Sequence, residues 1–380
     1  MEHNYGKNKR LRVLFLANIP SPYRVDFFNE FGKYCDLTVC FEGTSATDRD
    51  SKWVGNKAIG FSDIYLKGVR TGSDNFLCLE ILRILNEKWD AIILGGYSTP
   101  TLMLTIEYLK IKKIEFFIEV DGGLISEENK VKYAIKKHFI ASAKGWFSSG
   151  LKTNEYLTHY GADENRCFIY PFTSLTKLDF EKTNELLKIE KNEYKARLGI
   201  IEDKILLSVG RFSYQEGYGK GYDTLMRCAE ILDNKIGIYI VGDNPTEEFI
   251  TWKENKNLTN VHFVGFKTKQ ELAYYYAAAD AFVLMTRSDV WGLVINEAMM
   301  FNLPIITTEM CVAGVELVKE NENGFVLSVD DSINLKNKVE LLLNDEELLR
   351  RYSENSGKKI LGYTIEEMAI RHIKYLEEIL

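Results

Sequence analysis

A strand–turn–helix–strand pattern in the last third of the chain constrains the fold most. The apolar run AFVLMTR, residues 281–287, has the length of a strand and ends at a basic residue. Residues 293–301 are rich in Leu, Met, Ala and Glu, which favours a helix, and Pro304 ends it and opens a second apolar run. This pattern is half of a doubly wound α/β unit, and such units bind ligands where their parallel strands end.

Two carboxylates flank the predicted start of that helix. Asp289 lies before Gly292, and Glu297 lies about a turn and a half into the helix. The amides of Gly292, Leu293 and Val294 have no partner within the helix, so we expect them to face an anion such as a phosphate. Carboxylates beside a phosphate are costly unless they bind hydroxyls. The pattern therefore indicates a diphosphate ligand with sugar hydroxyls at both ends, and a capping Asp with a solvated Glu is the alternative.

Composition sets the broad class. A chain of 380 residues, 46% of them hydrophobic, favours two domains, and a net charge of −7 argues against general nucleic-acid binding. The six cysteines form no Cys-x-x-Cys pair and the five histidines show no metal-ligand spacing. No apolar signal core or stretch of transmembrane length occurs. We therefore expect a cytoplasmic protein with reduced thiols.

The first half alternates between expected strands and helices. A strand over residues 12–19 is followed by a turn with Asn18, Pro22 and Tyr23, without the glycine-rich loop of a nicotinamide or flavin site. Further predicted strands end at Gly96-Tyr97 and at Asp121-Gly122, and a helix is expected over residues 76–89. These strand ends mark one edge of the predicted sheet as a site.

Two charged segments of this half allow other interpretations. Asp48 and Asp50 form an Asp-x-Asp pair that could hold a divalent ion, although their polar loop favours solvated charges. Residues 130–152 are basic and partly amphipathic, which predicts either a helix on an anionic membrane surface or an ordinary surface helix.

The second half adds two cations. A strand over residues 204–211 ends at Arg211, and Lys220 follows a glycine-bearing loop. One guanidinium fork and one ammonium suit a diphosphate, and surface ion pairing is the alternative. Other predicted strands in this half end at Gly242 and at Phe266.

Residues 289–299 resemble the signature of the retaining glycosyltransferases of family 4. That signature has two glutamates separated by seven residues, a Gly three after the first, and Glu-Ala-Met at the second; here Asp289 replaces the first Glu. The resemblance covers nearly all of residues 204–330. It implies an α/β protein of the GT-B fold, with two Rossmann-like domains facing across a cleft. The expected parts are an acceptor-side domain over 1–172, a nucleotide-sugar-binding domain over 173–362, and a helix over 363–380 that returns to the first domain.

The resemblance also implies roles for site residues. Arg211 and Lys220 would hold the donor diphosphate, Asp289 the hydroxyls of the transferred sugar and Glu297 those of the ribose. Asp121 would stand near the position of a His that contacts the donor sugar in the family. The remaining predicted donor-binding residues are Gly210, Gly242, Phe266, Gly292, Leu293 and Val294. The acceptor-side residues are Asn18, Pro22, Tyr23, Gly96, Tyr97 and Gly122.

The resulting hypothesis is a metal-independent, retaining hexosyltransferase of cell-surface polysaccharide synthesis. It would move a sugar from a nucleoside-diphosphate sugar to a glycan or lipid-linked acceptor, with no cofactor and with peripheral contact to the inner face of the membrane. Retention would need no protein nucleophile, because the leaving phosphate helps to deprotonate the acceptor. The alternatives are a GT-B nucleotide-sugar epimerase, a catalytically silent nucleotide-sugar-binding subunit, and a metal-dependent transferase that uses Asp48 and Asp50.

Overall fold

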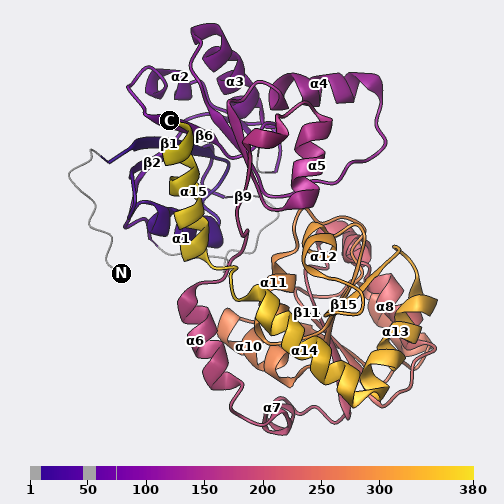
Figure 1. The fold of residues 1–380 in the computed structure, drawn as a ribbon. Helices are drawn as coiled ribbons and strands as arrows, with labels where there is room; N and C mark the ends of the chain where they lie inside the picture. The colour runs from indigo at the N-terminus through magenta and orange to yellow at the C-terminus, as the bar shows by residue number, and fades with distance from the viewer. Residues whose placement is uncertain (1–9, 46–56, 74) are drawn as a thin grey trace. The chain divides into compact units, whose positions relative to one another are not determined.

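The chain folds into two compact units (Figure 1). The computed structural model describes residues 10–45, 57–73 and 75–380. The first unit consists of Met1–Ser174 with Thr364–Leu380, and the second of Leu175–Tyr363. The expected domain boundaries, after residues 172 and 362, lie next to these divisions.

The first unit is built on a parallel sheet. Its strand order is β3 (Ser62–Tyr65), β2 (Asp36–Phe41), β1 (Arg12–Ala17), β6 (Ala91–Leu94), β7 (Phe117–Val120), β8 (Gly145–Ser148) and β9 (Cys167–Ile169). Each neighbouring pair in this order is parallel. The chain winds from β1 outward to β2 and then returns to the other side of β1 at β6, so the topological switch point lies between β1 and β6.

Helices and a short hairpin accompany this sheet. The helices are α1 (Pro22–Phe31), α2 (Ile81–Ile84), α3 (Pro100–Lys112), α4 (Lys130–Ile140), α5 (Leu151–His159) and α15 (Ile365–Ile379), with a 3-10 turn at Glu164–Arg166 and the hairpin β4 (Val69–Arg70) and β5 (Phe76–Leu77). The C-terminal helix α15 packs beside α1, where the rings of His372 and Phe27 lie 4.8 Å apart. The last segment of the chain is therefore part of the first unit.

The second unit repeats this plan. Its strand order is β12 (Val261–Gly265), β11 (Ile236–Val241), β10 (Lys204–Val209), β13 (Ala281–Leu284), β14 (Ile305–Thr308) and β15 (Gly324–Leu327), and each neighbouring pair is parallel. Its helices are α6 (Lys177–Leu186), α7 (Lys191–Leu198), α8 (Tyr222–Ala229), α9 (Glu247–Asn255), α10 (Lys269–Ala278), α11 (Leu293–Met300), α12 (Val312–Leu317), α13 (Ser332–Asn344) and α14 (Glu346–Ile360), with a 3-10 segment at Tyr214–Lys220. Its switch point lies between β10 and β13.

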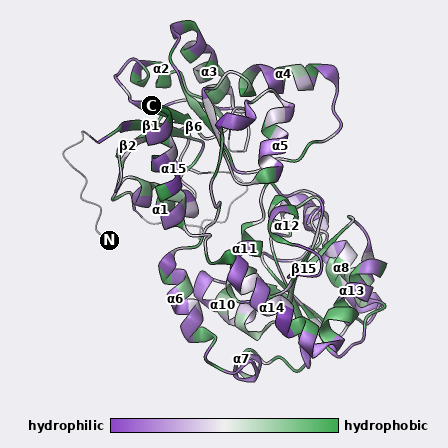
Figure 2. Cartoon of the chain, viewed as in Figure 1, coloured by the Kyte–Doolittle hydropathy of each residue, from purple (hydrophilic) through white to green (hydrophobic). Residues whose placement is uncertain are grey.

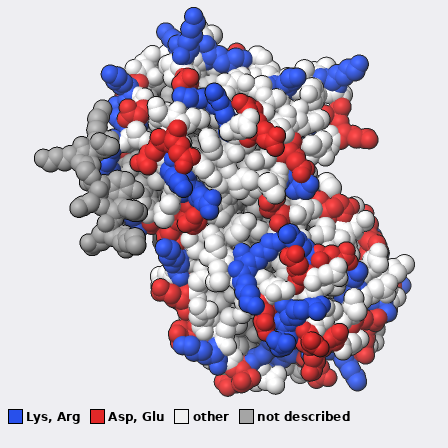
Figure 3. Space-filling model, viewed as in Figure 1, with Lys and Arg blue, Asp and Glu red and all other residues white. Residues whose placement is uncertain are grey.

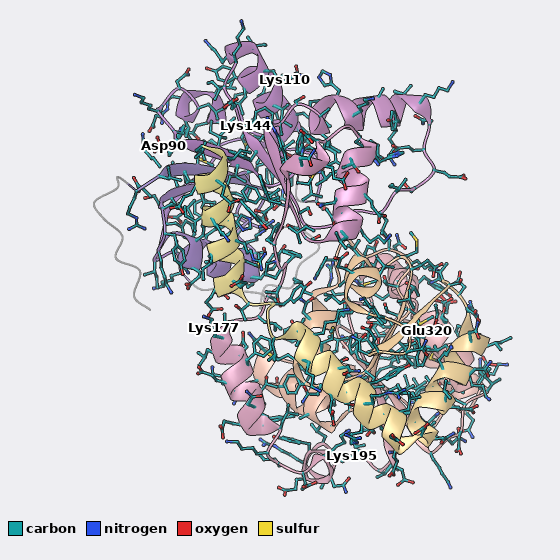
Figure 4. The ribbon with its side chains drawn as sticks, viewed as in Figure 1. Asp90, Lys110, Lys144, Lys177, Lys195 and Glu320 are labelled. Atoms are coloured by element: carbon teal, nitrogen blue, oxygen red, sulfur yellow. The ribbon has the colours of Figure 1, made fainter. Side chains whose placement is uncertain are left out.

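The central strands are buried on both faces, which explains their continuous apolar runs. Figure 2 shows the contrast between these hydrophobic strands and helices such as α14, whose outer face is hydrophilic. Buried polar contacts also hold the core. Lys195 of α7, labelled in Figure 4, donates to the carbonyl of Asp203 and pairs with Asp280. The two distances are 2.6 Å and 3.6 Å.

One helix prediction was wrong, and another holds over only part of its segment. Residues 76–89 contain strand β5 and only the short helix α2, because Thr101 Oγ1 donates to the carbonyl of Phe76 and accepts from the amide of Cys78. The expected basic helix over 130–152 ends at Ile140, because residues 145–148 form the buried strand β8 beside β7. Asp48 and Asp50 lie outside the described residues. In the part of the chain that is described, no helix is long and apolar enough to cross a bilayer.

Candidate functional site

The switch point of the second unit brings the predicted cationic and acidic residues together. Arg211 follows β10, and Asp289 follows the neighbouring strand β13. The Nζ atom of Lys220 lies 2.6 Å from Oδ2 of Asp289, and their side chains are 16% and 18% exposed. The two residues are 69 positions apart in sequence, so the fold itself creates this pair.

Gly292 begins helix α11 beside this pair. Its φ is +99°, and a Cβ there would lie 2.7 Å from Sγ of Cys311, so the position requires glycine. Gly292 is the N-cap and carries no side-chain cap, so the alternative interpretation of Asp289 as the capping residue is wrong. The amides of Leu293 and Val294 belong to the first turn, and both residues are half-buried. Burial raises the pKa of the Cys311 thiol to about 12, which keeps this neighbour protonated.

The glycines at the ends of β10 and β11 bring the two backbones close. A Cβ at Gly242 would lie 1.8 Å from the carbonyl oxygen of Gly210, which rules out a side chain at Gly242. The next residue, Asp243, accepts hydrogen bonds from the amides of Phe212 and Ser213. Asp243 therefore fixes the loop that begins at Arg211. Sequence reasoning assigned Asp243 no role, although its Gly-Asp motif at a strand end is a visible signal.

The remaining predicted donor residues lie on nearby elements of this unit. Phe266 follows β12 and is 41% exposed. The hydroxyl of Tyr276 on α10 donates to Oε2 of Glu297 on α11 at 3.0 Å. Tyr276 is buried, so this bond orients the half-buried Glu297 carboxylate from the core.

A second ion pair supports the same loops. Arg287 binds both oxygens of buried Asp223 at 2.7 Å and also pairs with Asp330. These contacts tie the end of β13 to α8 and to the loop after β15. Arg287 thus supports the loop that carries Asp289.

The first unit places its predicted residues at its own switch point. Asn18 follows β1 and Gly96 follows the neighbouring strand β6. Pro22 is the first residue of α1, and the Tyr23 ring packs edge-on against Phe172, with centroids 5.8 Å apart. Tyr97 follows Gly96, and its hydroxyl is hydrogen-bonded to the hydroxyl of Tyr156 on α5.

Asp121 belongs to a buried charge cluster. Its carboxylate accepts from Arg24 of α1 at 2.5 Å and from the hydroxyl of Tyr170 at 3.4 Å, and Gly122 follows it. Arg24 also pairs with Glu119, whose second oxygen lies 3.1 Å from Nε2 of His372 on α15. Arg24, Glu119 and His372 are thus buried together, and the Asp121 side chain, 25% exposed, packs against Arg24.

Comparisons with known proteins decide the family. The chain is 31% identical over 282 residues to an uncharacterized glycosyltransferase of Haemophilus influenzae. This match covers 69% of this chain and 76% of that protein. Residues 190–359 match the family model of the glycosyl transferases group 1. This chain is a group 1 glycosyltransferase. It is also 27% identical over 219 residues to the capsular polysaccharide biosynthesis glycosyltransferase CapM of Staphylococcus aureus, a match that spans 56% of this chain and 55% of CapM.

Solved structures confirm the fold of this group 1 glycosyltransferase. The crystal structure of Anabaena HepE in complex with UDP matches with a TM-score of 0.76 at 15% identity, over 97% of this chain and 100% of that one. Sucrose-phosphate synthase from Thermosynechococcus elongatus matches with a TM-score of 0.72 at 16% identity, over 97% and 99% of the two chains. The expected GT-B fold class is therefore correct.

Sequence reasoning missed the partners of Asp121 in this glycosyltransferase. Arg24 lies next to predicted Tyr23, but Glu119 and His372 are 253 positions apart and no local pattern links them. Burial raises the pKa of Glu119, whereas the charges of Arg24 and His372 lower it; the net effect places it at about 2. Burial, together with the charge of Glu119, raises the pKa of Asp121.

Helix α4 of the glycosyltransferase has two different faces. Lys136, a lysine of the basic segment 130–152, points inward and lies 2.8 Å from Glu128 and 3.0 Å from the Tyr160 hydroxyl. Lys144 lies beyond the helix, in the turn before β8 (Figure 4), and pairs with Glu115 at 2.7 Å. The outward face instead carries exposed apolar and basic residues: Lys130, Val131, Lys132, Ala134, Ile135 and Lys137.

Among the described residues, no group of three or more His, Cys, Asp or Glu side chains is arranged to hold a metal ion. The expectation of a metal-independent reaction stays a prediction.

Proposed function

We propose that this glycosyltransferase transfers a sugar from a nucleoside-diphosphate sugar to a glycan or lipid-linked acceptor, with retention of anomeric configuration and without a metal ion. The observation that carries the proposal is the Lys220–Asp289 pair beside the first turn of α11, at the switch point of the second unit. Doubly wound folds bind nucleotides at this point, and helix N-termini favour phosphate there.

Each donor part has a matching group. Arg211 and Lys220 hold the diphosphate, together with the amides of Leu293 and Val294. Asp289 accepts hydrogen bonds from hydroxyls of the transferred sugar, and Glu297 accepts them from the ribose. Gly210 and Gly242 let the ligand approach the strand ends, and Phe266 offers an exposed ring for the base.

In the reaction, the bond between the anomeric carbon and the diphosphate oxygen breaks. The acceptor oxygen bonds to the same carbon from the same face, and its proton passes to the departing phosphate. Negative charge grows on the diphosphate during this step, and Arg211 and Lys220 stabilise it. Residues of the first unit, including Tyr97 and Asn18, bind the acceptor.

Similar proteins support a donor and a role for this enzyme. HepE has been crystallised with UDP-glucose as well as with UDP, so UDP is the first nucleotide to test. CapM is named for capsular polysaccharide biosynthesis, which supports a function in cell-surface polysaccharide synthesis.

A thermal-shift panel tests the donor side. The full chain is heated with UDP, GDP, ADP or CDP and their common sugar conjugates, with and without chelator. A ligand that binds only the folded state raises the melting temperature by mass action. We expect one base to give a clear shift that chelator leaves unchanged and that Arg211→Ala removes. Arg350→Ala on the exposed face of α14 is the control and should keep the shift.

Turnover assays separate this function from its alternatives. Consumption of the donor without any acceptor indicates an epimerase, and nucleotide binding without turnover under all acceptors indicates a silent subunit. Loss of activity in chelator indicates a metal-dependent transferase, which could use Asp48 and Asp50. An NMR spectrum of the first product reports whether the anomeric configuration is retained, and inversion would refute the proposed mechanism.

The outward face of α4 supports contact with an anionic bilayer. Val131 and Ile135 are 69% and 47% exposed there, between exposed lysines. Acidic and basic side chains are otherwise mixed over the face drawn in Figure 3, so the proposed attraction is local to α4.

Vesicle co-sedimentation tests this contact. The full chain should bind phosphatidylglycerol vesicles at low salt, and Lys132→Glu with Lys137→Glu should weaken that binding. The same charge change at Lys182 of α6 and at Lys188, two residues after that helix ends, is the control: Lys182→Glu with Lys188→Glu. Equal binding by both double variants would refute a role for α4.

A further inference from the structure

The Lys220–Asp289 ion pair joins two groups that the proposed function assigns to different parts of the donor. Lys220 serves the diphosphate and Asp289 serves the sugar, yet here their side chains contact each other at 2.6 Å. Neither side chain is more than 18% exposed, so solvent weakens the pair less than it weakens a surface pair.

The backbone holds both residues in place for this contact. The carbonyl of Gly219 accepts hydrogen bonds from Oγ1 of Thr286 and from the amide of Arg287, both at 3.0 Å. On the other side, the amide of Asp289 donates to the carbonyl of Met310 at 3.0 Å. The segment that carries Lys220 is thus fastened to the end of β13, and the loop of Asp289 is fastened to the loop after β14. The ion pair is built into the fold.

A nucleoside diphosphate without a sugar interacts unfavourably with this pair. Its phosphates attract Lys220, but they offer Asp289 only negative oxygens. A carboxylate and a phosphate that lie close together repel each other strongly when solvent is largely excluded. A nucleoside-diphosphate sugar presents the same phosphates to Lys220 and also presents hydroxyl donors to Asp289, so both charges keep a partner.

We propose that Asp289 makes the site discriminate between the donor and the nucleoside diphosphate that the reaction leaves behind. While the sugar is present, its hydroxyls occupy Asp289 and the diphosphate occupies Lys220. After transfer the hydroxyls leave with the product, Asp289 competes with the diphosphate for Lys220, and the ion pair re-forms as the nucleotide departs. This inference rests on the proposed function and adds product release to it.

Calorimetric titration of the full chain tests the inference. The probes are UDP and UDP-glucose, or the diphosphate and hexose conjugate of whichever base of the thermal panel binds. We expect Asp289→Asn to bind the bare nucleoside diphosphate about tenfold more tightly than the unaltered protein, and to lose most of its preference for the sugar conjugate. Asp203→Asn, which removes one charge at the opposite end of β10, should leave both affinities unchanged.

A second variant keeps the test decisive if Asp289→Asn folds poorly. Asp289→Glu keeps the negative charge, so it should keep the weak binding of the bare diphosphate, whereas Lys220→Gln should weaken binding of both probes. If the unaltered protein binds the diphosphate and Asp289→Asn binds it equally or more weakly, the discrimination is refuted and the proposed function stands. If no nucleoside diphosphate binds the unaltered protein, both fail.

Discussion

Replacing Gly221 tests how the fold holds Lys220. Gly221 has a φ of +71°, and a Cβ there would lie 1.8 Å from the carbonyl oxygen of Met285 at the end of β13. Gly199 is a matched control in the same unit, because its φ is +68° and a Cβ there would meet nothing within 4 Å. Alanine at either position adopts a left-handed conformation, which costs about 1–2 kcal/mol. Only the Gly221 variant adds a steric conflict.

The size of that conflict follows from the contacts. A separation of 1.8 Å is roughly half of the 3.5 Å at which non-bonded atoms are most stable, so the segment must move by on the order of 1 Å. Such a shift breaks the two 3.0 Å hydrogen bonds to the carbonyl of Gly219, each worth about 0.5–1.5 kcal/mol. We therefore expect Gly221→Ala to lower the free energy of unfolding by about 2–5 kcal/mol, against about 1–2 kcal/mol for Gly199→Ala.

Urea unfolding of the full chain at 25 °C measures this difference, and calorimetry with the nucleoside diphosphate measures its effect on the site. Gly221→Ala should also weaken nucleotide binding about tenfold, because Lys220 moves with the segment. Gly199→Ala should bind normally. Equal destabilisation by the two variants, or normal nucleotide binding by Gly221→Ala, would show that this close approach does not position Lys220.

Three further predictions concern polar contacts within the two units. The lowered pKa of Glu119 means that its contribution to stability is present above about pH 4.5, the usual pKa of Glu, and is lost as the pH falls through its folded value of about 2. Glu119→Gln should therefore lower the free energy of unfolding at pH 7 by about 3 kcal/mol and flatten its decline in acid, as urea unfolding from pH 7 to pH 3 would record. Tyr276→Phe removes the hydrogen bond to Glu297 and should lower stability by about 1 kcal/mol and weaken donor binding several-fold in calorimetry. Asp243→Asn leaves one acceptor oxygen where two amides donate, so it should loosen the Arg211 loop and weaken binding of the nucleoside diphosphate about fivefold in the same titration.

Each of these three predictions has an outcome that would contradict it. If the free energy of unfolding of Glu119→Gln falls as steeply from pH 7 to pH 3 as that of the unaltered protein, other groups cause the acid sensitivity. Unchanged donor affinity in Tyr276→Phe would mean that Glu297 keeps its orientation without this hydroxyl. Nucleotide binding that survives Asp243→Asn would show that the Arg211 loop is held by its other contacts.

The sequence predicted the fold, and it indicated that the cationic and acidic residues of the second unit come together, because both depend on local patterns. Parallel strands buried on two faces must be apolar runs, so β1, β6, β10 and β13 are visible as such. Polar residues just beyond those runs then lie at one edge of a sheet. Arg211 and Asp289 follow adjacent strands for this reason. The roles of these residues toward a donor stay predictions.

The first unit shows where local patterns stop being informative. Asp121 was singled out by its place at a strand end, but its environment is set by Arg24 from α1 and, through Glu119, by His372 from α15. Charge and residue spacing within one segment cannot identify such partners, since Arg24 and His372 are ordinary residues of their own helices. The sequence pattern likewise gave no sign that Lys136 points inward, because its partners Glu128 and Tyr160 lie outside its own helix. Because Glu119 and Asp121 lie two residues apart along one strand end, the C-terminal helix contributes to the surroundings of the Asp121 carboxylate. The last segment of this glycosyltransferase is therefore expected to influence Asp121 as well as to complete the core.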